Sequence, residues 1–283
     1  MRCAFIASGL GSILLLPSCS PGSSENDLPN IILILADDLG YGDLSCLNGK
    51  SGIATPNIDS MAESGVIFTD AHSSSAVSTP TRYGIMTGRY SWRSTLKSGV
   101  LDGYSRALIP LTRKTIASML REKGYHTAYI GKWHLGWDWN NISGGKDSVD
   151  FSKPVANGPT TIGFDHFFGF SGSLDMPPYV YVENDMPTSL PNRKTTGNNS
   201  PAGSPGYDGS FWREGPTGSD FQHDECTPLF TGKACSYIRE RSPSDKPYFL
   251  LRFSRVIFFQ GVNIPFSSME FLILINFLAS EYS

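Results

Sequence analysis

Asn30 to Ala36 have the sequence NIILILA, a continuous apolar stretch of strand length. A strand with no polar face is typical of the centre of a parallel sheet that has helices on both sides. Asp37-Asp38-Leu39-Gly40-Tyr41-Gly42 follow it directly. Because open α/β sheets bind ligands at the carboxyl ends of their strands, the sequence predicts an α/β fold with a site immediately after this strand.

Asp37 and Asp38 are adjacent acids at the end of an apolar strand. Two neighbouring carboxylates repel each other, so they either face water or hold a cation. Hard oxygen ligands suit Ca²⁺, and Mg²⁺ is the second choice. The alternative is an ordinary acidic turn. We predict that these two residues bind a metal ion.

Ser78-Thr79-Pro80-Thr81-Arg82 continues as YGIMTGR and predicts a short helix. Pro80 favours a first turn, and Gly88 can supply the left-handed residue that ends the helix. Ser78 then faces free backbone N–H groups, and Arg82 lies on the same helical face one turn later. A hydroxyl beside an anion pocket suits transfer of a sulfuryl or phosphoryl group. The alternative is a capped helix with no chemical role.

Further elements follow from periodicity and from Gly and Pro positions. Residues 55–65 predict a helix, residues 66–68 a strand, residues 111–123 an amphipathic helix and residues 125–130 a strand. The last strand leads into Gly-Lys-Trp-His-Leu-Gly. If the extended geometry continues, Lys132 and His134 point the same way, towards the predicted anion pocket.

Three motifs together resemble those of type I sulfatases, the formylglycine-dependent arylsulfatase family. They are the strand followed by Asp-Asp-x-Gly-x-Gly, the Ser-x-Pro-x-Arg sequence with a later Thr-Gly-Arg, and Gly-Lys-Trp-His-Leu-Gly. A serine at the modified position resembles the serine-type bacterial branch. The resemblance implies a mixed, mostly parallel sheet flanked by helices, as in alkaline phosphatases, with the later part of the domain missing.

The resemblance also implies the chemistry. A maturase would oxidise Ser78 to formylglycine, whose hydrate attacks the sulfur of a sulfated carbohydrate or aryl sulfate. Asp37, Asp38 and the residue formed from Ser78 would hold Ca²⁺, and Arg82, Lys132 and His134 would bind the hydrate and the sulfate. One alternative is a phosphoester hydrolase of the same superfamily that uses Ser78 directly. Another is a catalytically inert, truncated fragment.

Four other polar residues receive weaker predictions. His72 and His166 are expected to be structural, Asp175 is a candidate for the substrate pocket, and His223 is placed in a loop near the substrate side. Residues 187–218 are rich in Pro, Gly, Asn and Ser, which predicts a long surface loop. Residues 231–241 predict a helix, and residues 248–251 predict a strand.

Residues 1–19 have the pattern of a lipoprotein signal peptide, with Arg2 before an apolar stretch that is too short to span a membrane. Leu-Pro-Ser-Cys resembles a lipobox, so Cys19 would be lipidated; cleavage by ordinary signal peptidase is the alternative. Residues 20–28 predict a flexible linker. We expect a bacterial lipoprotein, periplasmic or at the cell surface, that contacts membrane only through its lipid anchor.

A net charge of −3 gives no indication of a nucleic-acid partner. Outside the signal peptide, Cys46, Cys226 and Cys235 lack metal-ligand spacing. In an exported chain the last two could form a disulfide, which the sequence does not decide.

Residues 29–254 are predicted to be the amino-terminal part of a sulfatase catalytic domain. After the strand at residues 248–251, sulfatases have a Pro-His segment, an Asp-Asn pair and another Lys, none of which is present here. Residues 255–283 therefore predict an aberrant tail that is unrelated to the family. Loss of the later strands would leave an unpaired sheet edge and a weak metal site.

Overall fold

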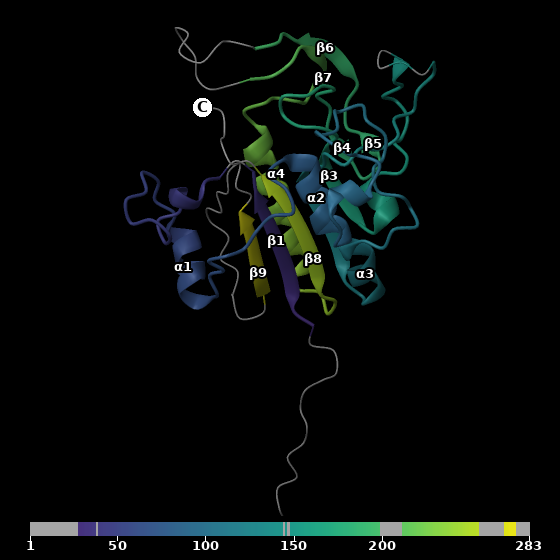
Figure 1. The fold of residues 1–283 in the computed structure, drawn as a ribbon. Helices are drawn as coiled ribbons and strands as arrows, with labels where there is room; N and C mark the ends of the chain where they lie inside the picture. Colours follow the sequence, from purple (N-terminus) through teal and green to yellow (C-terminus); the bar gives the residue numbers. More distant parts are fainter. Residues whose placement is uncertain are drawn as a thin grey trace, which may run out of the picture.

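A computed structural model describes residues 28–37, 39–143, 145, 148–198, 211–254 and, for the backbone, 269–275. In this part of the chain a seven-stranded sheet has the order β5-β4-β3-β2-β8-β1-β9 (Figure 1). Five of its strands are parallel: β1 (Asn30–Ala36), β2 (His126–Lys132), β3 (His166–Phe170), β8 (Tyr248–Ser254) and β9 (Met269–Ile275). β4 (Val182–Glu183) and β5 (Met186–Pro187) complete one edge in antiparallel orientation. The α/β prediction is confirmed.

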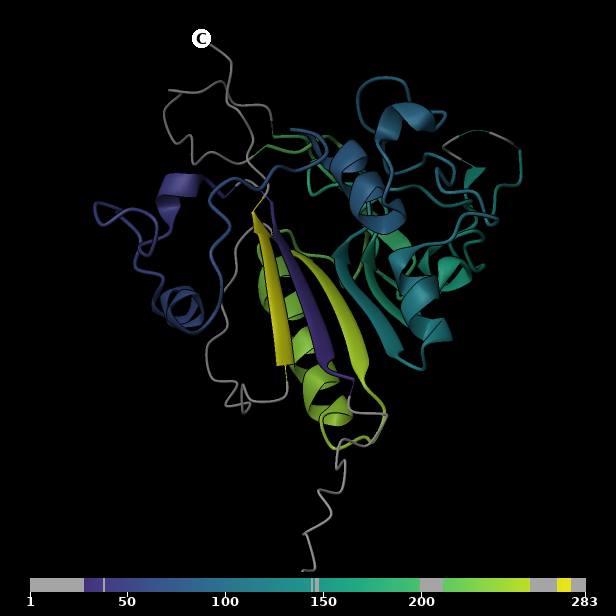
Figure 2. The same cartoon turned by 60° about the horizontal axis from the view of Figure 1, so that its bottom comes forward.

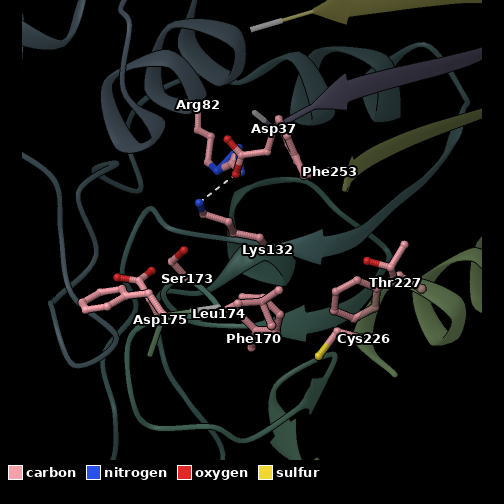
Figure 3. Close-up of a pocket in the computed structure, with 12 residues that line it drawn as sticks. Asp37, Arg82, Lys132, Phe170, Ser173, Leu174, Asp175, Cys226, Thr227 and Phe253 are labelled. Carbon is pink, nitrogen blue, oxygen red and sulfur yellow. Dashed lines mark hydrogen bonds and ion pairs between the residues drawn. The ribbon is translucent and has the colours of Figure 1, made fainter. Parts of the chain in front are cut away.

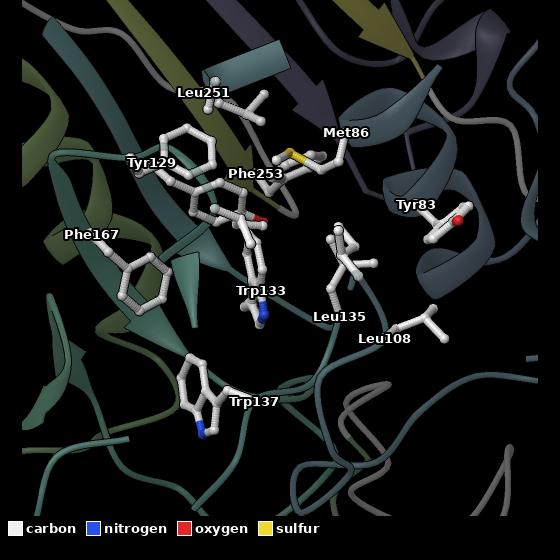
Figure 4. Packing of buried hydrophobic residues seen from close by; sticks show 14 of the residues in the cluster. Tyr83, Met86, Leu108, Tyr129, Trp133, Leu135, Trp137, Phe167, Leu251 and Phe253 are labelled. Carbon is white, nitrogen blue, oxygen red and sulfur yellow. The ribbon is translucent and has the colours of Figure 1, made fainter. Parts of the chain in front are cut away.

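Helices cover both faces of the sheet, as the apolar sequence of β1 requires. Leu33 and Leu35 pack in the cluster that contains Tyr83 and Met86 of α2 (Ser78–Thr87) and Ala117 of α3 (Ile116–Glu122). Figure 4 shows the aromatic part of this cluster around Tyr129, Trp133 and Phe167.

The opposite face of the sheet packs on α4 (Cys226–Arg241). Ile32 and Ile34 belong to this second cluster, together with Phe230 and Ile238 of α4. Figure 2 shows α4 behind β1, β8 and β9, on the side away from α2. The result is a three-layer arrangement in which β1 is buried on both faces.

β1 lies between β8 and β9 and pairs with both over its length. β8 adjoins β2 on its other side, so β1 and β2 are not direct neighbours. β9 belongs to residues 255–283, the segment that the sequence separates from the domain, and it forms one edge of the sheet.

α1 (Pro56–Ser64) confirms the helix predicted at residues 55–65, although it contributes no buried residue and stands apart from the sheet (Figure 1). The helix predicted at residues 111–123 begins later, because Thr115 caps α3 by accepting a hydrogen bond from the Ser118 N–H. α4 begins five residues earlier than predicted. Short 3-10 turns are η1 (Tyr41–Asp43), η2 (Ser91–Arg93) and η4 (Pro159–Ile162).

The strand predicted at residues 66–68 is wrong. Val66 and Phe68 are 78% and 66% exposed and lie in irregular backbone. The long loop predicted at residues 187–218 is also wrong in part. β6 (Pro191–Thr195) and β7 (Gly215–Gly218) pair there as an antiparallel two-stranded sheet.

Cys226 and Cys235 are free and buried, so the disulfide that the sequence allowed is not formed. Both lie on α4, nine positions apart. At about 1.5 Å of rise per residue, their Cα atoms are farther apart than the roughly 7 Å that a disulfide allows. Within the described residues, no helix is both long and apolar enough to traverse a bilayer.

Candidate active site

Three elements deliver the predicted site residues to one region. Asp37 directly follows β1, Ser78 and Arg82 lie on α2, and Lys132 is the last residue of β2. His134 follows two residues later, after the strand has ended. Because the carboxyl ends of parallel strands meet at one edge, the fold itself brings these side chains together.

Ser78 is the first residue of α2, and the extended Val77 is the N-cap. Ser78 therefore does not occupy the capping position, and the Val77 side chain makes no capping hydrogen bond. The Oγ of Ser78 lies 2.8 Å from Nδ1 of His134. The alternative of a purely capping serine is therefore not supported, because the hydroxyl is bonded to an imidazole from another element. Gly88 ends the helix in the left-handed conformation, as predicted.

His134 is buried and is held in one orientation. Its Nε2 lies 2.6 Å from the backbone carbonyl of Leu101, which can only accept a hydrogen bond. Burial lowers the pKa of His134 to about 3, with further lowering by the charges of Lys132 and Arg82. The imidazole is therefore neutral, carries its proton on Nε2 and accepts a hydrogen bond from the Ser78 hydroxyl at Nδ1.

Thr79, the residue after Ser78, is hydrogen-bonded to both segments that orient His134. Its Oγ1 donates to the backbone carbonyl of His134 over 2.9 Å and accepts from the backbone N–H of Leu101 over 3.2 Å. His134 has a φ of 56°, a left-handed conformation that is uncommon for a non-glycine residue. The predicted reason for the convergence of Lys132 and His134, a continuing strand, is therefore wrong. The chain turns after Lys132.

Asp37 lies between two cations (Figure 3). Its Oδ2 is 2.8 Å from Nζ of Lys132 and 3.2 Å from Nη2 of Arg82. Burial alone would raise the pKa of Asp37, but Arg82 and Lys132 hold it well below its usual value. Burial and the charge of Arg82 lower the pKa of Lys132, and the carboxylate of Asp37 opposes this. Arg82, Lys132 and Asp37 together therefore carry a net positive charge.

Arg82 is almost completely buried, at 1% exposure. Its guanidinium carbon lies 4.2 Å from the ring centroid of Phe253, which covers one face. Within the described residues, its Nε and Nη1 have no hydrogen-bond partner. Buried donors without a partner are costly, so these two N–H groups are suited to an anionic ligand.

A cavity of about 160 Å³ opens beside this pair of cations. Asp37, Arg82 and Lys132 line it at one end, and Asp175 lines it from the segment after β3. The pocket prediction for Asp175 is thus supported. Ser78 and His134 do not line the cavity wall, whereas Arg82, on the same helix as Ser78, and Lys132, two residues before His134, do. The volume exceeds the roughly 30 Å³ of one liquid water several-fold and is below the ~300 Å³ of drug-sized sites.

A Ca²⁺ ion takes about 6–8 oxygen ligands. Asp37 supplies one carboxylate, and its Oδ2 is already bonded to two cations. Among the described residues, no group of three or more His, Cys, Asp or Glu side chains could hold a metal ion. These residues alone do not fit a calcium site. Asp38, the second predicted ligand, and Cys19, the predicted lipidation site, lie outside the described residues.

His72, His166 and His223 have partners other than Ser78. His72 is exposed and pairs with Asp70, and His166 stacks on Tyr237, with ring centroids 6.1 Å apart. His223 stacks on Trp212 at 4.7 Å, near the wall of the cavity. The structural assignment of His166 agrees with this packing.

Some site residues escaped the sequence analysis. Leu101 acts through its backbone carbonyl, so its residue type carries no signal. Phe253 and Arg213 become part of the site only through long-range packing. No local sequence pattern marks Arg213 as the partner of Asp175, which lies 38 positions away.

Comparison with known proteins agrees with this geometry. A family model described as Sulfatase matches residues 29–250. An N-acetylgalactosamine-6-O-sulfatase of Bacteroides thetaiotaomicron is 35% identical over 272 residues, which cover 85% of this chain and 51% of the relative. Human arylsulfatase D is 40% identical over 169 residues, which cover 57% of this chain and 26% of the relative.

A solved structure from work on glycosaminoglycan metabolism by Bacteroides thetaiotaomicron superposes with a TM-score of 0.67 at 35% identity. The match covers 82% of this chain and 52% of that chain. The chain thus spans about half the length of the first of these curated relatives and of the solved structure.

Proposed function

The chain belongs to the sulfatase family, a family of sulfuric ester hydrolases, and on this basis we propose that it hydrolyses sulfate esters of carbohydrates. The proposal includes oxidation of Ser78 to formylglycine by a maturase. A relative named for a sulfated amino sugar supports the choice of substrate class.

One observation carries the proposal: the buried guanidinium of Arg82 has two nitrogens, Nε and Nη1, without a hydrogen-bond partner among the described residues, and Arg82 lies one helical turn from Ser78. Lys132 adds a second positive charge at the same carboxylate. Sulfate oxygens would satisfy donors that are otherwise buried without partners.

The modified Ser78 would carry out the reaction in two steps on one carbon atom. As a hydrated aldehyde it supplies two hydroxyls on one carbon: one attacks sulfur while the alcohol leaves, and the other then loses its proton as sulfate is expelled and the aldehyde re-forms. His134 accepts a hydrogen bond from that hydroxyl at Nδ1, because Nε2 is already protonated and bonded to Leu101, and the proton leaves with the sulfate. Arg82 and Lys132 stabilise the negative charge on the sulfuryl oxygens. Binding of Ca²⁺ by Asp37, Asp38 and the residue formed from Ser78 stays a prediction.

A second function is favoured by one contact. The unmodified Ser78 hydroxyl is already bonded to a neutral imidazole at 2.8 Å, the arrangement of a serine nucleophile and its general base. A phosphoester hydrolase that uses Ser78 directly would have this geometry.

The test is to produce the chain with a serine-type maturase in an exporting bacterium and to measure the mass of the Ser78 peptide. Loss of two hydrogens at Ser78, with sulfate release from a sulfated amino sugar, is the expected result. Ser78→Ala should release none, and Ser75→Ala is the matched control. Unmodified Ser78 with phosphate release would establish the second function, and no turnover of either ester would support the inert fragment.

Export as a periplasmic or cell-surface lipoprotein is part of the same proposal and rests on residues 1–19. Metabolic labelling with a palmitate analogue tests it, with Cys19→Ala as the control that should lose the label.

A further inference from the structure

The cavity beside Arg82 and Lys132 carries charge of the opposite sign at its other end. Figure 3 places Asp175 and Ser173 away from the three residues Asp37, Arg82 and Lys132. Asp175 lines the cavity, and its side chain is 26% exposed. An anion bound by the two cations would therefore extend its remaining atoms towards a carboxylate.

Asp175 is held rigidly in this position. Arg213 Nη1 is bonded to the Asp175 carboxylate and, over 3.2 Å, to its backbone carbonyl. The backbone N–H of Arg213 donates to the same carbonyl over 3.1 Å, and Tyr179 Oη donates to the Arg213 carbonyl over 2.6 Å. These bonds join the segment after β3 to the chain just before β7, so the carboxylate cannot swing away from the cavity.

Asp175 is ionised, and its charge acts on Lys132 at the other end of the cavity. Burial alone would raise the pKa of Asp175, but hydrogen bonds from Ser173 and Arg213 hold it below its usual value. Burial and Arg82 lower the pKa of Lys132, and Asp175 acts against them together with Asp37. A fixed carboxylate accepts hydrogen bonds well and repels a second anion nearby.

We infer that Asp175, fixed by Arg213, is a specificity-determining residue that accepts a hydrogen bond from a hydroxyl or amide N–H of the sugar next to its sulfated position. The same carboxylate disfavours sugars that carry a second sulfate or a carboxylate there. This inference rests on the proposed function, because it takes the sulfate to lie at Arg82 and Lys132. A site built to pair with a polar group discriminates strongly against a ligand that leaves it unpaired.

Binding and turnover separate this inference from the proposed function. The full chain with unmodified Ser78 is titrated calorimetrically with a monosulfated amino sugar and with its disulfated counterpart. We expect the native chain to prefer the monosulfated probe. Asp175→Asn should weaken binding of that probe by about 10- to 100-fold and reduce the preference. Arg213→Gln should weaken binding of the monosulfated probe, because the Asp175 carboxylate is no longer fixed, but it should increase the preference over the disulfated probe, because the Asp175 charge is left uncompensated.

The opposite changes in preference of these two variants distinguish recognition from a structural ion pair, whose loss would shift both variants the same way. Asp138→Asn is the matched control. Asp138 has a 22% exposed side chain and pairs with Arg106, and it does not line the cavity. A native chain that binds neither probe, or an Asp175→Asn variant with native preference, overturns the inference. Selective binding without sulfate release by the matured chain supports the inference and refutes the proposed function instead.

Discussion

The Thr79 hydroxyl donates a hydrogen bond to the backbone carbonyl of His134 over 2.9 Å. The same oxygen accepts from the N–H of Leu101, whose carbonyl lies 2.6 Å from Nε2 of His134. One buried hydroxyl thus joins both segments that orient the imidazole. Thr79 touches no reacting atom, so its role is that of a positioning residue.

Replacement of Thr79 by Val should destabilise the protein by about 1–3 kcal/mol, because the N–H of Leu101 and the carbonyl of His134 lose a buried partner. It should also let the His134 ring populate both tautomers, which nitrogen-15 NMR of the imidazole detects. Thr79→Ser keeps the hydroxyl and should retain the native spectrum. A Val variant with one native tautomer would contradict the positioning role.

Sodium sulfate should stabilise the native chain through Arg82 and Lys132. At about 100 times its Kd, a ligand that binds only the folded state adds about 2.7 kcal/mol to the unfolding free energy. Lys132→Met should lose most of this gain in thermal unfolding. Lys114→Met removes a surface lysine paired with Glu122 and should keep the full gain. Equal stabilisation by sodium chloride at matched ionic strength would show that sulfate is not bound specifically.

Calcium should have little effect on the stability of this chain. The Asp37 carboxylate is bonded to two cations, and the described residues do not add further ligands. We expect calcium chloride to change the Tm no more than magnesium chloride does. A calcium-specific rise of several degrees that EDTA reverses would show that Asp38 and other residues complete a metal site.

His166 should make stability depend on pH. Burial lowers its pKa below the model-peptide value of 6.5, although Glu183 opposes this, so the folded protein holds the imidazole neutral. Below about pH 6.5 the unfolded chain binds a proton that the folded chain does not, and stability is lost on acidification at no more than about 1.4 kcal/mol per pH unit. His166→Phe keeps a ring against Tyr237 and should show a shallower loss between about pH 7 and about pH 5 in urea unfolding. Parallel curves for the two proteins would refute this.

The sequence predicted those parts of the fold and site that residue types determine locally. The apolar sequence of β1 identified a central strand, and Pro80 and Gly88 bounded α2. It could not identify the exposure of Val66 and Phe68, because a β-branched and aromatic triplet has the same composition whether it pairs or not.

The contacts that the sequence missed are long-range or made by backbone. β6 and β7 lie in a Pro- and Gly-rich stretch whose composition is typical of a loop, and pairing between distant segments overrides that tendency. Asp175 and Arg213 are 38 residues apart, and no local pattern relates them. The direction of His134 depends on a left-handed turn at a histidine, which no side-chain period predicts.

The position of β1 between β8 and β9 also sets the order in which the fold can close. Among the described strands β1 is synthesised first, yet its neighbours β8 and β9 come after all the others, and the Tyr248 N–H donates to Asn30 Oδ1 across 218 positions. Contacts this far apart in the sequence make folding slow, since most of the chain must exist before β1 gains a partner. During synthesis the segment that carries Ser78 therefore precedes its own scaffold.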